Sequence, residues 1–343
     1  MIDTIVVGAG KWALECWVPL LNEYRDRYRV SAVVDPDRAH AEHLAGALGL
    51  EPSDTFVTVP DAVSQRPSAV AGIVLSSPEH HAGPIIDLAN AGRHVLTEKP
   101  LATTSTDLAR ITEAVHAGDV QAAVIQNYRY QRRIQLARTL AASGELGPFH
   151  YLAARFAADY RQPESWDVGD AHTMNDPLLV EGSIHHLDMI RYLTGRNIDT
   201  ITAYTANPTG SSFHGDCIGG ALIRLDGGGF ALYEASLLAA ATENRWRNEY
   251  YRLEFEGGAI TCDGPTVTVV RERSTRVHHV PDEDMFTGHR TLVTAFADWL
   301  EGGPAIETTI ADNAFSIAAI FAAITSTRTG TPARVIVPAT PSR

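Results

Sequence analysis

The chain has 343 residues, of which 45% are hydrophobic and 20% are charged, and its formal net charge is −13 at pH 7. This length predicts about two domains, each able to bury its own core, and the composition is that of an ordinary globular protein. The acidic balance argues against nucleic acid or an anionic membrane as the main partner, since both would repel the chain. A small-molecule substrate stays open, because its site can be locally basic.

Cysteine usage and the start of the chain indicate a reducing compartment. The three cysteines, Cys16, Cys217 and Cys262, have no metal-like or redox spacing, which is typical of plain packing. The N-terminus leads straight into a strand pattern rather than a signal peptide, and no run approaches about 18 consecutive apolar residues. We therefore expect a cytoplasmic protein with no membrane-spanning segment.

The first chemical motif is a glycine turn between an apolar run, residues 5–7, and a helical pattern that continues to Leu21. Strand, glycine turn and helix together form a unit that binds the pyrophosphate of a dinucleotide. Gly8 permits the tight turn, and Gly10 lets the backbone approach the phosphate oxygens. Ala13 stands where the third glycine would be, which this fingerprint tolerates.

A second predicted strand, residues 30–34, leads into Asp35, about 20 residues beyond the glycine turn. An acid there binds the ribose hydroxyls and repels a 2′-phosphate, which favours NAD over NADP. Arg38 keeps this preference moderate, because an arginine can accommodate the extra phosphate. The alternative is that Asp35 only caps a helix that starts at Pro36.

Strands and helices alternate through the first third of the chain, which predicts a doubly wound parallel sheet, a Rossmann domain. The predicted helices cover residues 40–48, 82–91 and 105–117, and the further strands cover residues 70–75, 94–97 and 121–128. We place the domain boundary after the last strand. The prediction is a dinucleotide-binding domain over residues 1–127 and a substrate-binding and oligomerisation domain over residues 128–343.

The strand at residues 94–97 ends in Glu98, Lys99 and Pro100. Proline stops the strand, so Lys99 is held on a rigid corner at the carboxyl end of a parallel sheet, where ligands bind in such folds. The alternative is a solvated lysine that pairs with Glu98.

The strand at residues 70–75 ends in a loop that contains Ser76, Ser77 and His81. This loop lies at the same predicted sheet edge, so we expect it to face the cofactor. His81 could contact the nicotinamide side. A helix-capping or surface histidine is the competing interpretation.

The second domain has a different pattern, which predicts an α/β domain with a large, mostly antiparallel, open sheet. Strand-like runs lie at residues 151–160, 200–205, 218–225, 230–236, 251–255 and 267–270, and helices at residues 292–300 and 311–325. An open sheet with apolar residues on both faces needs cover, so one face should pack against another subunit.

A predicted helix in the second domain places Glu181, His185 and Asp188 on one face, at positions i, i+4 and i+7. A carboxylate one turn from an imidazole can orient it for proton transfer. His186 points about 100° away from His185, so the two cannot jointly bind one metal in the usual way, and we expect no metal site. The alternative is a structural face with an ion pair between Asp188 and Arg191.

With these motifs the chain resembles the Gfo/Idh/MocA family of NAD(P)-dependent oxidoreductases, which includes glucose–fructose oxidoreductase and inositol dehydrogenase. The resemblance covers the glycine turn, Glu98-Lys99-Pro100, Tyr128-Arg129-Tyr130, the Gly-Glu-Leu-Gly turn at residues 144–147, and His185 through Asp188. It implies a Rossmann domain and an α/β domain whose open sheet forms homodimers or homotetramers. It also implies that Lys99 and His185 share a substrate hydroxyl, and that the Lys99–Pro100 peptide is cis.

One position departs from the family pattern. Many members carry aspartate four residues before the histidine, where this chain has Glu181. The longer carboxylate can still reach the imidazole or the substrate, so we count Glu181 with Lys99 and His185 as catalytic. The resemblance implies that Asp188 is more structural than catalytic.

The predicted reaction is hydride transfer between a secondary alcohol of a sugar, cyclitol or sugar derivative and a nicotinamide cofactor, with His185 taking the hydroxyl proton and Lys99 stabilising the alkoxide. The expected cofactor-binding residues are Gly8, Ala9, Gly10, Lys11, Trp12, Asp35, Arg38, Ser76, Ser77, His81, Glu98 and Lys99. The expected substrate-binding residues are Lys99, Tyr128, Arg129, Tyr160, Trp166, His172 and His185. Two alternatives stay open: redox-assisted glycoside cleavage with bound NAD, and a non-catalytic sensor of NAD or sugar.

Overall fold

The computed structural model describes residues 1–163, 171–240 and 249–338. The chain's internal contacts divide into two units, one formed by Met1–Gln126 with His289–Ala314 and one formed by Asn127–Gly288 with Phe315–Val337. The division expected from the sequence assigned residues 289–314 to the second domain, whereas their contacts are with the first. Hydrophobic periodicity showed that this segment is helical but could not show which sheet it covers.

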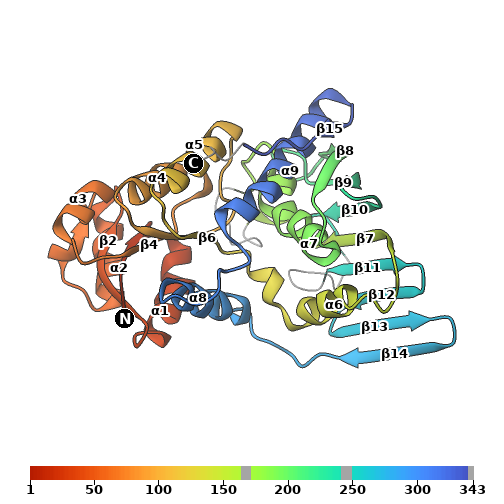
Figure 1. Ribbon diagram of the computed structural model, residues 1–343. Helices are drawn as coiled ribbons and strands as arrows, with labels where there is room; N and C mark the ends of the chain where they lie inside the picture. Colours follow the sequence, from red (N-terminus) through yellow and green to blue (C-terminus); the bar gives the residue numbers. More distant parts are fainter. Residues whose placement is uncertain (164–170, 241–248, 339–343) are drawn as a thin grey trace. The chain divides into compact units, whose positions relative to one another are not determined.

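The first unit contains a six-stranded parallel sheet in the order β3-β2-β1-β4-β5-β6, which confirms the predicted doubly wound fold (Figure 1). Its strands are β1 (Ile2–Val7), β2 (Tyr28–Val34), β3 (Thr55–Phe56), β4 (Ala71–Val74), β5 (His94–Thr97) and β6 (Ala122–Val124). Its helices are α1 (Val18–Glu23), α2 (Arg38–Leu48), α3 (Val59–Gln65), α4 (Ala82–Asn90), α5 (Ser105–Ala117) and α8 (Thr287–Leu300).

The central strands of this sheet are buried along their whole length because helices cover both faces. All six residues of β1 and all four of β4 are buried. The order of the strands reverses between β1 and β4, so the loops after these two strands diverge. Such a switch point is where doubly wound sheets bind ligands, outside the carboxyl ends of the strands.

The last strand of this sheet is shorter than predicted. We expected a strand over residues 121–128, but β6 ends at Val124, and Asn127–Tyr130 forms a 3₁₀ turn. The neighbouring strand β5 ends at Thr97, whose carbonyl accepts from the Ile125 amide as the last rung. Without a partner strand beyond this point, apolar residues alone do not extend the ladder.

The second unit contains a nine-stranded sheet in the order β14-β13-β12-β11-β7-β10-β9-β8-β15. Among the described strands of this sheet, only β7 and β10 pair in parallel, so the sheet is mostly antiparallel, as predicted. Its strands are β7 (Phe149–Ala157), β8 (Ile198–Ala206), β9 (Ile218–Leu225), β10 (Phe230–Ser236), β11 (Tyr250–Phe255), β12 (Gly258–Asp263), β13 (Thr266–Arg271), β14 (Ser274–His279) and β15 (Ala333–Arg334).

Three helices, α6 (Arg132–Ala142), α7 (Ile184–Thr194) and α9 (Ile310–Thr329), cover one face of this sheet (Figure 1). The opposite face is open and carries large apolar side chains. Leu222 on β9 lies directly across from Leu232 on β10, and their side chains are 49% and 46% exposed. Tyr204 on β8 is 77% exposed on the neighbouring strand. These side chains make this part of the open face apolar.

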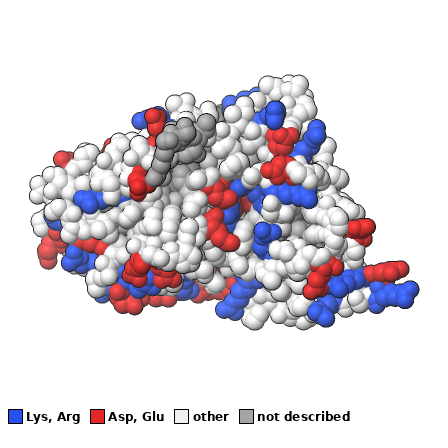
Figure 2. Space-filling model, in the orientation of Figure 1, with Lys and Arg blue, Asp and Glu red and all other residues white. Residues whose placement is uncertain are grey.

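Helix α9 is the one described helix that is long and apolar enough to cross a membrane, with a mean hydropathy of 1.4. Polar residues interrupt the helix, so it contains no long run of consecutive apolar residues. Of its apolar window, 61% is buried inside the protein, and core helices share this length and composition. On the face shown in Figure 2, acidic and basic side chains are interspersed.

Candidate active site

The glycine turn after β1 touches the loop after β4. Gly8 has φ +95°, and a Cβ atom there would lie 2.4 Å from the Ser76 amide nitrogen. Any side chain at this position would therefore collide with backbone and strain the turn. A Cβ atom on Gly10, by contrast, would meet no atom within 4 Å. The turn is thus packed tightly toward the sheet and is open at Gly10, as a pyrophosphate site requires.

The carboxylate of Asp35 at the end of β2 is tied to this turn. One oxygen accepts from the Ala9 amide and the other from the Asp37 amide, each at 2.8 Å. Helix α2 is capped by Asp37, which accepts from Ala39 and His40. The capping role weighed for Asp35 therefore falls to Asp37. Each carboxylate oxygen of Asp35 keeps a second lone pair, with which it can accept a ribose hydroxyl.

The two basic residues near the turn lie in exposed ion pairs. Lys11 lies 3.8 Å from Glu15, and Arg38 donates to Glu42 at 2.8 Å. The side chain of Arg38 is 76% exposed, so this pair holds it only weakly. These residues fit NAD: the turn has room for the pyrophosphate and Asp35 supplies the ribose acceptor.

The helix after the glycine turn begins with a π-helical turn over Ala13–Trp17, closed by a bond from the Val18 amide to the Ala13 carbonyl. This turn brings two indoles to one acceptor. Trp12 and Trp17 both donate to the same oxygen of Glu98, at 2.8 and 3.0 Å. Single-residue expansions of a helix are frequent at functional sites, and the sequence gives no periodic signal for them.

Glu98, at the end of β5, is a buried carboxylate. Burial by itself would raise its pKa, but hydrogen bonds and charge from His289, with the bonds from the two indoles, lower the pKa to about 2. The ring nitrogen Nε2 of His289 lies 3.8 Å from the oxygen that the indoles share. His289 belongs to α8, and our sequence analysis did not identify it, because a lone histidine at the start of a helix has no motif.

Lys99 is half-buried at the corner after β5, and its peptide bond to Pro100 is cis. Its amide donates to the second oxygen of Glu98 at 3.3 Å. Glu98 is therefore a link between the backbone of Lys99 and the helix of the glycine turn. The alternative of a solvated lysine that pairs with Glu98 fits poorly, because Lys99 is half-buried and Glu98 is 7% exposed.

His81 joins two loops at the same sheet edge. Its two ring nitrogens lie 2.8 Å from the carbonyl oxygens of Pro100 and Ser76, and the residue is 1% exposed. Ser76 is half-buried and Ser77 is exposed, with its hydroxyl 2.9 Å from His80.

In the second unit, the predicted helix around His185 has two parts. Leu178–Ser183 forms a π-helical turn and α7 follows from Ile184. The Ser183 hydroxyl donates to the Leu178 carbonyl at 2.9 Å, which supports the wide turn. Glu181 lies in the π turn and is 3% exposed, and His185 in the first turn of α7 is 5% exposed.

The ring of His185 stacks on Tyr128, with the two ring centroids 4.1 Å apart and the planes at 17°. Tyr128 lies in the 3₁₀ turn Asn127–Tyr130, so two predicted site residues meet within one unit. A stacked ring limits the rotation of the imidazole, which is needed if one nitrogen is to face a substrate.

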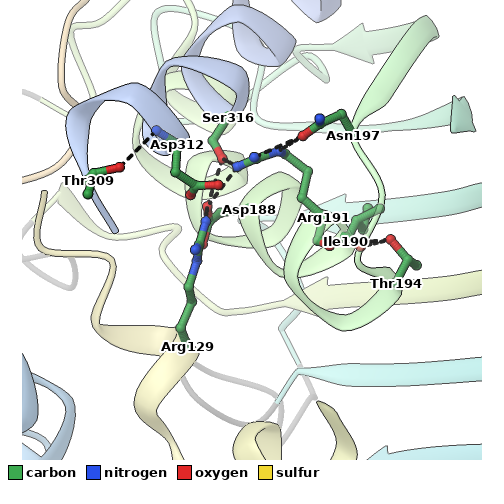
Figure 3. Close-up of polar contacts among 9 residues, drawn as sticks. All are labelled: Arg129, Asp188, Ile190, Arg191, Thr194, Asn197, Thr309, Asp312 and Ser316. Atoms are coloured by element: carbon green, nitrogen blue, oxygen red, sulfur yellow. Dashed lines mark hydrogen bonds and ion pairs between the residues drawn. The ribbon is translucent and has the colours of Figure 1, made fainter. Parts of the chain in front are cut away.

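Arg129, the next residue of that turn, makes a bidentate ion pair with Asp188 (Figure 3). The two bonds measure 2.8 and 2.6 Å, and the side chains are 4% and 0% exposed. Ser316 on α9 donates to Asp188 and accepts from Arg191, which lies 3.6 Å from the same carboxylate. The ion pair weighed for Asp188 and Arg191 is thus present within a larger network.

The carboxylate of Asp188 stays ionised in this network. Burial would raise its pKa, but the charge and hydrogen bonds of Arg129, the charge of Arg191 and the bond from Ser316 lower it. Two nitrogens of the Arg129 guanidinium donate to Asp188. This favours a role for Arg129 in supporting the site over the substrate contact that we expected.

The side chain of His186, as predicted, points away from that of His185 and has different neighbours. Its Nδ1 lies 2.6 Å from the Tyr233 hydroxyl, and its Nε2 lies 3.7 Å from Glu249. Arg133 donates to Glu249 at 2.7 Å, so the buried carboxylate is paired. Over residues 1–163, 171–240 and 249–338, no group of three or more His, Cys, Asp or Glu side chains could hold a metal ion.

Two of the remaining predicted substrate residues lie together. The His172 Nε2 is 2.9 Å from the Tyr160 carbonyl, and the His172 ring stacks on Phe213 with centroids 4.0 Å apart. Both Tyr160 and His172 are half-buried. Trp166, also predicted to contact substrate, lies outside the described residues.

Comparisons with known proteins cover both units. The model of an oxidoreductase family with an NAD-binding Rossmann fold, GFO_IDH_MocA, matches residues 2–126, and the GFO/IDH/MocA C-terminal domain matches residues 134–261. The uncharacterized protein y4oX of Sinorhizobium fredii is 31% identical over 343 residues, 96% of this chain and 94% of the relative. Inositol 2-dehydrogenase of Corynebacterium glutamicum is 26% identical over 200 residues, 57% of this chain and 55% of that enzyme.

Solved structures share the fold over nearly the whole chain. The WlbA dehydrogenase of Bordetella pertussis, in complex with NADH and UDP-GlcNAcA, superposes with a TM-score of 0.82 at 20% identity. The match covers 98% of each chain. At this identity the likeness concerns the arrangement of strands and helices.

Proposed function

We propose that this chain, which belongs to the Gfo/Idh/MocA family of NAD-binding oxidoreductases, transfers a hydride between a secondary alcohol of a sugar, cyclitol or sugar derivative and the nicotinamide. The observation that carries the proposal is the place of Lys99. It lies at the carboxyl end of β5, on the sheet edge where the glycine turn and Asp35 form a dinucleotide site. A cation at this edge can act on an oxygen next to the hydride-transfer carbon.

The substrate class is supported by the relatives. One is named as an inositol dehydrogenase, and one structural neighbour holds the sugar nucleotide derivative UDP-GlcNAcA. The aromatic side chain of Tyr128, which is 5% exposed, supports the same class, because aromatic rings suit the apolar faces of a sugar ring. For this chain we propose Lys99, Tyr128, Tyr160, Trp166, His172 and His185 as the residues that contact the substrate.

NAD is the proposed choice over NADP. The Asp35 carboxylate is fixed by the Ala9 and Asp37 amides at the end of β2. A fixed anion beside the ribose disfavours a 2′-phosphate. Arg38, which pairs with Glu42 at the surface, leaves some capacity for NADP.

We assign the chemical steps to three side chains. When bound, the cofactor accepts or returns the hydride at its nicotinamide ring. His185 removes the proton from the substrate hydroxyl in the oxidative direction, with its ring held by Tyr128. Lys99 donates a hydrogen bond to the same oxygen and stabilises the alkoxide that forms. Glu181, one turn before His185, is the carboxylate that we propose to orient the imidazole.

The open face of the nine-stranded sheet is the proposed homo-oligomer interface. Its exposed Leu222, Leu232 and Tyr204 would leave water in a dimer or a tetramer. A cytoplasmic location remains the expectation from cysteine usage.

The direct test is a panel of sugars and cyclitols with NAD and NADP, followed by the absorbance of the reduced cofactor. We expect turnover with NAD on at least one polyol. Product formation from glycosides without net NADH would favour redox-assisted cleavage instead. A thermal shift with NAD and no turnover on any polyol would favour the non-catalytic sensor.

A further inference from the structure

Four residues of the first unit, Trp12, Trp17, Glu98 and His289, form what we call the Glu98 cluster. One oxygen of Glu98 receives both indole N–H groups at 2.8 and 3.0 Å and lies 3.8 Å from the His289 ring. The other oxygen receives the amide of Lys99 at 3.3 Å. The carboxylate therefore has the helix of the glycine turn and α8 on one side and the Lys99 corner on the other.

We propose that Trp17 and His289 are positioning residues of the hydride-transfer reaction, which act through Glu98 to hold Lys99 and the glycine turn in one arrangement. This inference rests on the proposed function, because it concerns the placement of Lys99. Neither residue carries a motif that would connect it to the reaction.

The energetics of burial support this role. A buried anion is tolerated only where donors satisfy its oxygens. Trp17 and Glu98 are 1% and 7% exposed and His289 is 4% exposed, so water cannot replace a lost donor without rearrangement. Glu98 also raises the pKa of the neighbouring Cys16 thiol, although burial is the larger cause of that shift. Removing the Trp17 donor, or the His289 ring that lies 3.8 Å from the carboxylate, should loosen Glu98 and, through it, Lys99.

The helix geometry supports it too. Trp12 and Trp17 are five residues apart, which in an α-helix would place their side chains about 140° apart around the axis. The π-helical turn Ala13–Trp17 has i to i+5 bonding, which widens the turn and so brings side chains five residues apart closer together around the axis than in an α-helix. The irregular turn is therefore the device by which both indoles reach one oxygen.

The cluster also connects cofactor binding to Lys99. Trp12 is 38% exposed in the first turn after Gly10, where the pyrophosphate is expected. A cofactor bound at this turn would lie close to the Trp12 indole, whose N–H group donates to Glu98. Cofactor binding should therefore change the environment of Trp12 and, through Glu98, the position of the Lys99 backbone.

Indole NMR tests the cluster without any need for turnover. The chain has five tryptophans, so a ¹H–¹⁵N spectrum contains five indole signals, which single Trp→Phe variants assign. We expect E98Q and His289→Leu each to shift the signals of Trp12 and Trp17 together, and NAD to shift Trp12. W299F on α8 is the matched control and should leave both signals in place. Independent behaviour of the two signals in E98Q would overturn the proposal.

Steady-state kinetics of variants made in the wild type and in E98Q test the positioning role. The loss of a polar contact with a buried charge, such as the hydrogen bond of Trp17 or the nearby ring of His289, corresponds to about tenfold in rate or more. We expect Trp17→Phe and His289→Leu to lower kcat about tenfold, with the KM for the polyol changed less than about threefold. His289→Gln, which keeps an N–H donor, should recover most of kcat.

The decisive experiment measures kcat after His289→Leu is introduced into the E98Q variant. If His289 acts through Glu98, the second substitution should lower kcat by less than about twofold there, since coupled residues are not additive. A full tenfold loss in that background would contradict the proposal. If Lys99→Ala kept full activity, the proposed function would fail, while the indole shifts would still decide whether the cluster exists.

Discussion

Tyr128 and His185 stack with their ring centroids 4.1 Å apart, and the residues next to this stack, Arg129 and Asp188, form a buried bidentate ion pair. The 3₁₀ turn Asn127–Tyr130 is thus joined to helix α7 by two adjacent contacts. The ion pair fixes the distance between the two elements, and the stack fixes the orientation of the imidazole. A proton-transfer histidine needs both.

The stack gives the first prediction. Tyr128→Leu removes the ring that limits rotation of His185, so we expect kcat to fall about 10- to 100-fold, within the range that positioning of a proton-transfer group supplies. Tyr128→Phe keeps the ring and should retain most of kcat. Steady-state kinetics at saturating NAD measure both. Equal losses in the two variants would point to the hydroxyl rather than the stack.

The buried ion pair between Arg129 and Asp188 gives the second prediction. Asp188→Asn leaves Arg129 buried without its counter-charge, which costs about 3–5 kcal/mol when one partner of a buried pair is removed. We expect that loss in the free energy of unfolding measured with urea. The control is Glu42→Gln, which removes an exposed partner of Arg38 and should change stability by less than about 1 kcal/mol.

Acid stability depends on Glu98. Its pKa is lowered to about 2 in the folded chain, from an unperturbed value of 4.5. A lowered pKa stabilises the folded state fully above the unfolded value, and the contribution is lost as pH falls through the folded one. The gap in unfolding free energy between the wild type and Glu98→Gln should therefore narrow as pH falls from about 4.5 toward about 2. A constant gap in urea titrations would refute the assignment.

Gly8 should tolerate no side chain. Gly8→Ala brings a Cβ atom 2.4 Å from the Ser76 amide in a backbone with φ +95°, so the turn must move. We expect the Kd for NAD to rise at least about tenfold, since the turn carries the pyrophosphate site. Gly83→Ala on α4, where a Cβ atom meets nothing within 4 Å, is the control and should bind NAD normally.

Asp35 should set the choice of cofactor. Asp35→Asn keeps an acceptor for the Ala9 amide but removes the charge, so the ratio of kcat/KM for NADP over NAD should rise about tenfold. Asp37→Asn, two residues away, keeps a good helix cap and should leave the ratio unchanged. If the ratio of kcat/KM for NADP over NAD were unchanged in Asp35→Asn, residues other than Asp35 would determine the choice of cofactor.

Elements with a strong local signal were predicted closely. Helix α5 runs over Ser105–Ala117 as expected, because Thr104 caps it and its apolar period is regular. Strands β9 and β10 also have the predicted bounds, since turn residues mark both ends. In these cases the local pattern and the tertiary environment agree.

The differences arise where distant residues decide the local structure. The π turns at Ala13–Trp17 and Leu178–Ser183 have no sequence period of their own. Strand β14 alternates weakly and forms only as a partner of β13, so it was missed. His289 joins Glu98 across 191 positions of sequence, a contact that a single sequence does not encode in any motif.

The central claim is hydride transfer from a carbinol carbon, with proton transfer by His185 and alkoxide stabilisation by Lys99. The most direct measurement is mass spectrometry of the cofactor after reaction of NAD with polyols deuterated at the carbinol carbons. The account predicts reduced cofactor that carries one deuterium, formed about 10²- to 10⁴-fold more slowly by His185→Ala and Lys99→Ala, which still bind NAD. Reduced cofactor without deuterium, or wild-type rates in both variants, would contradict it.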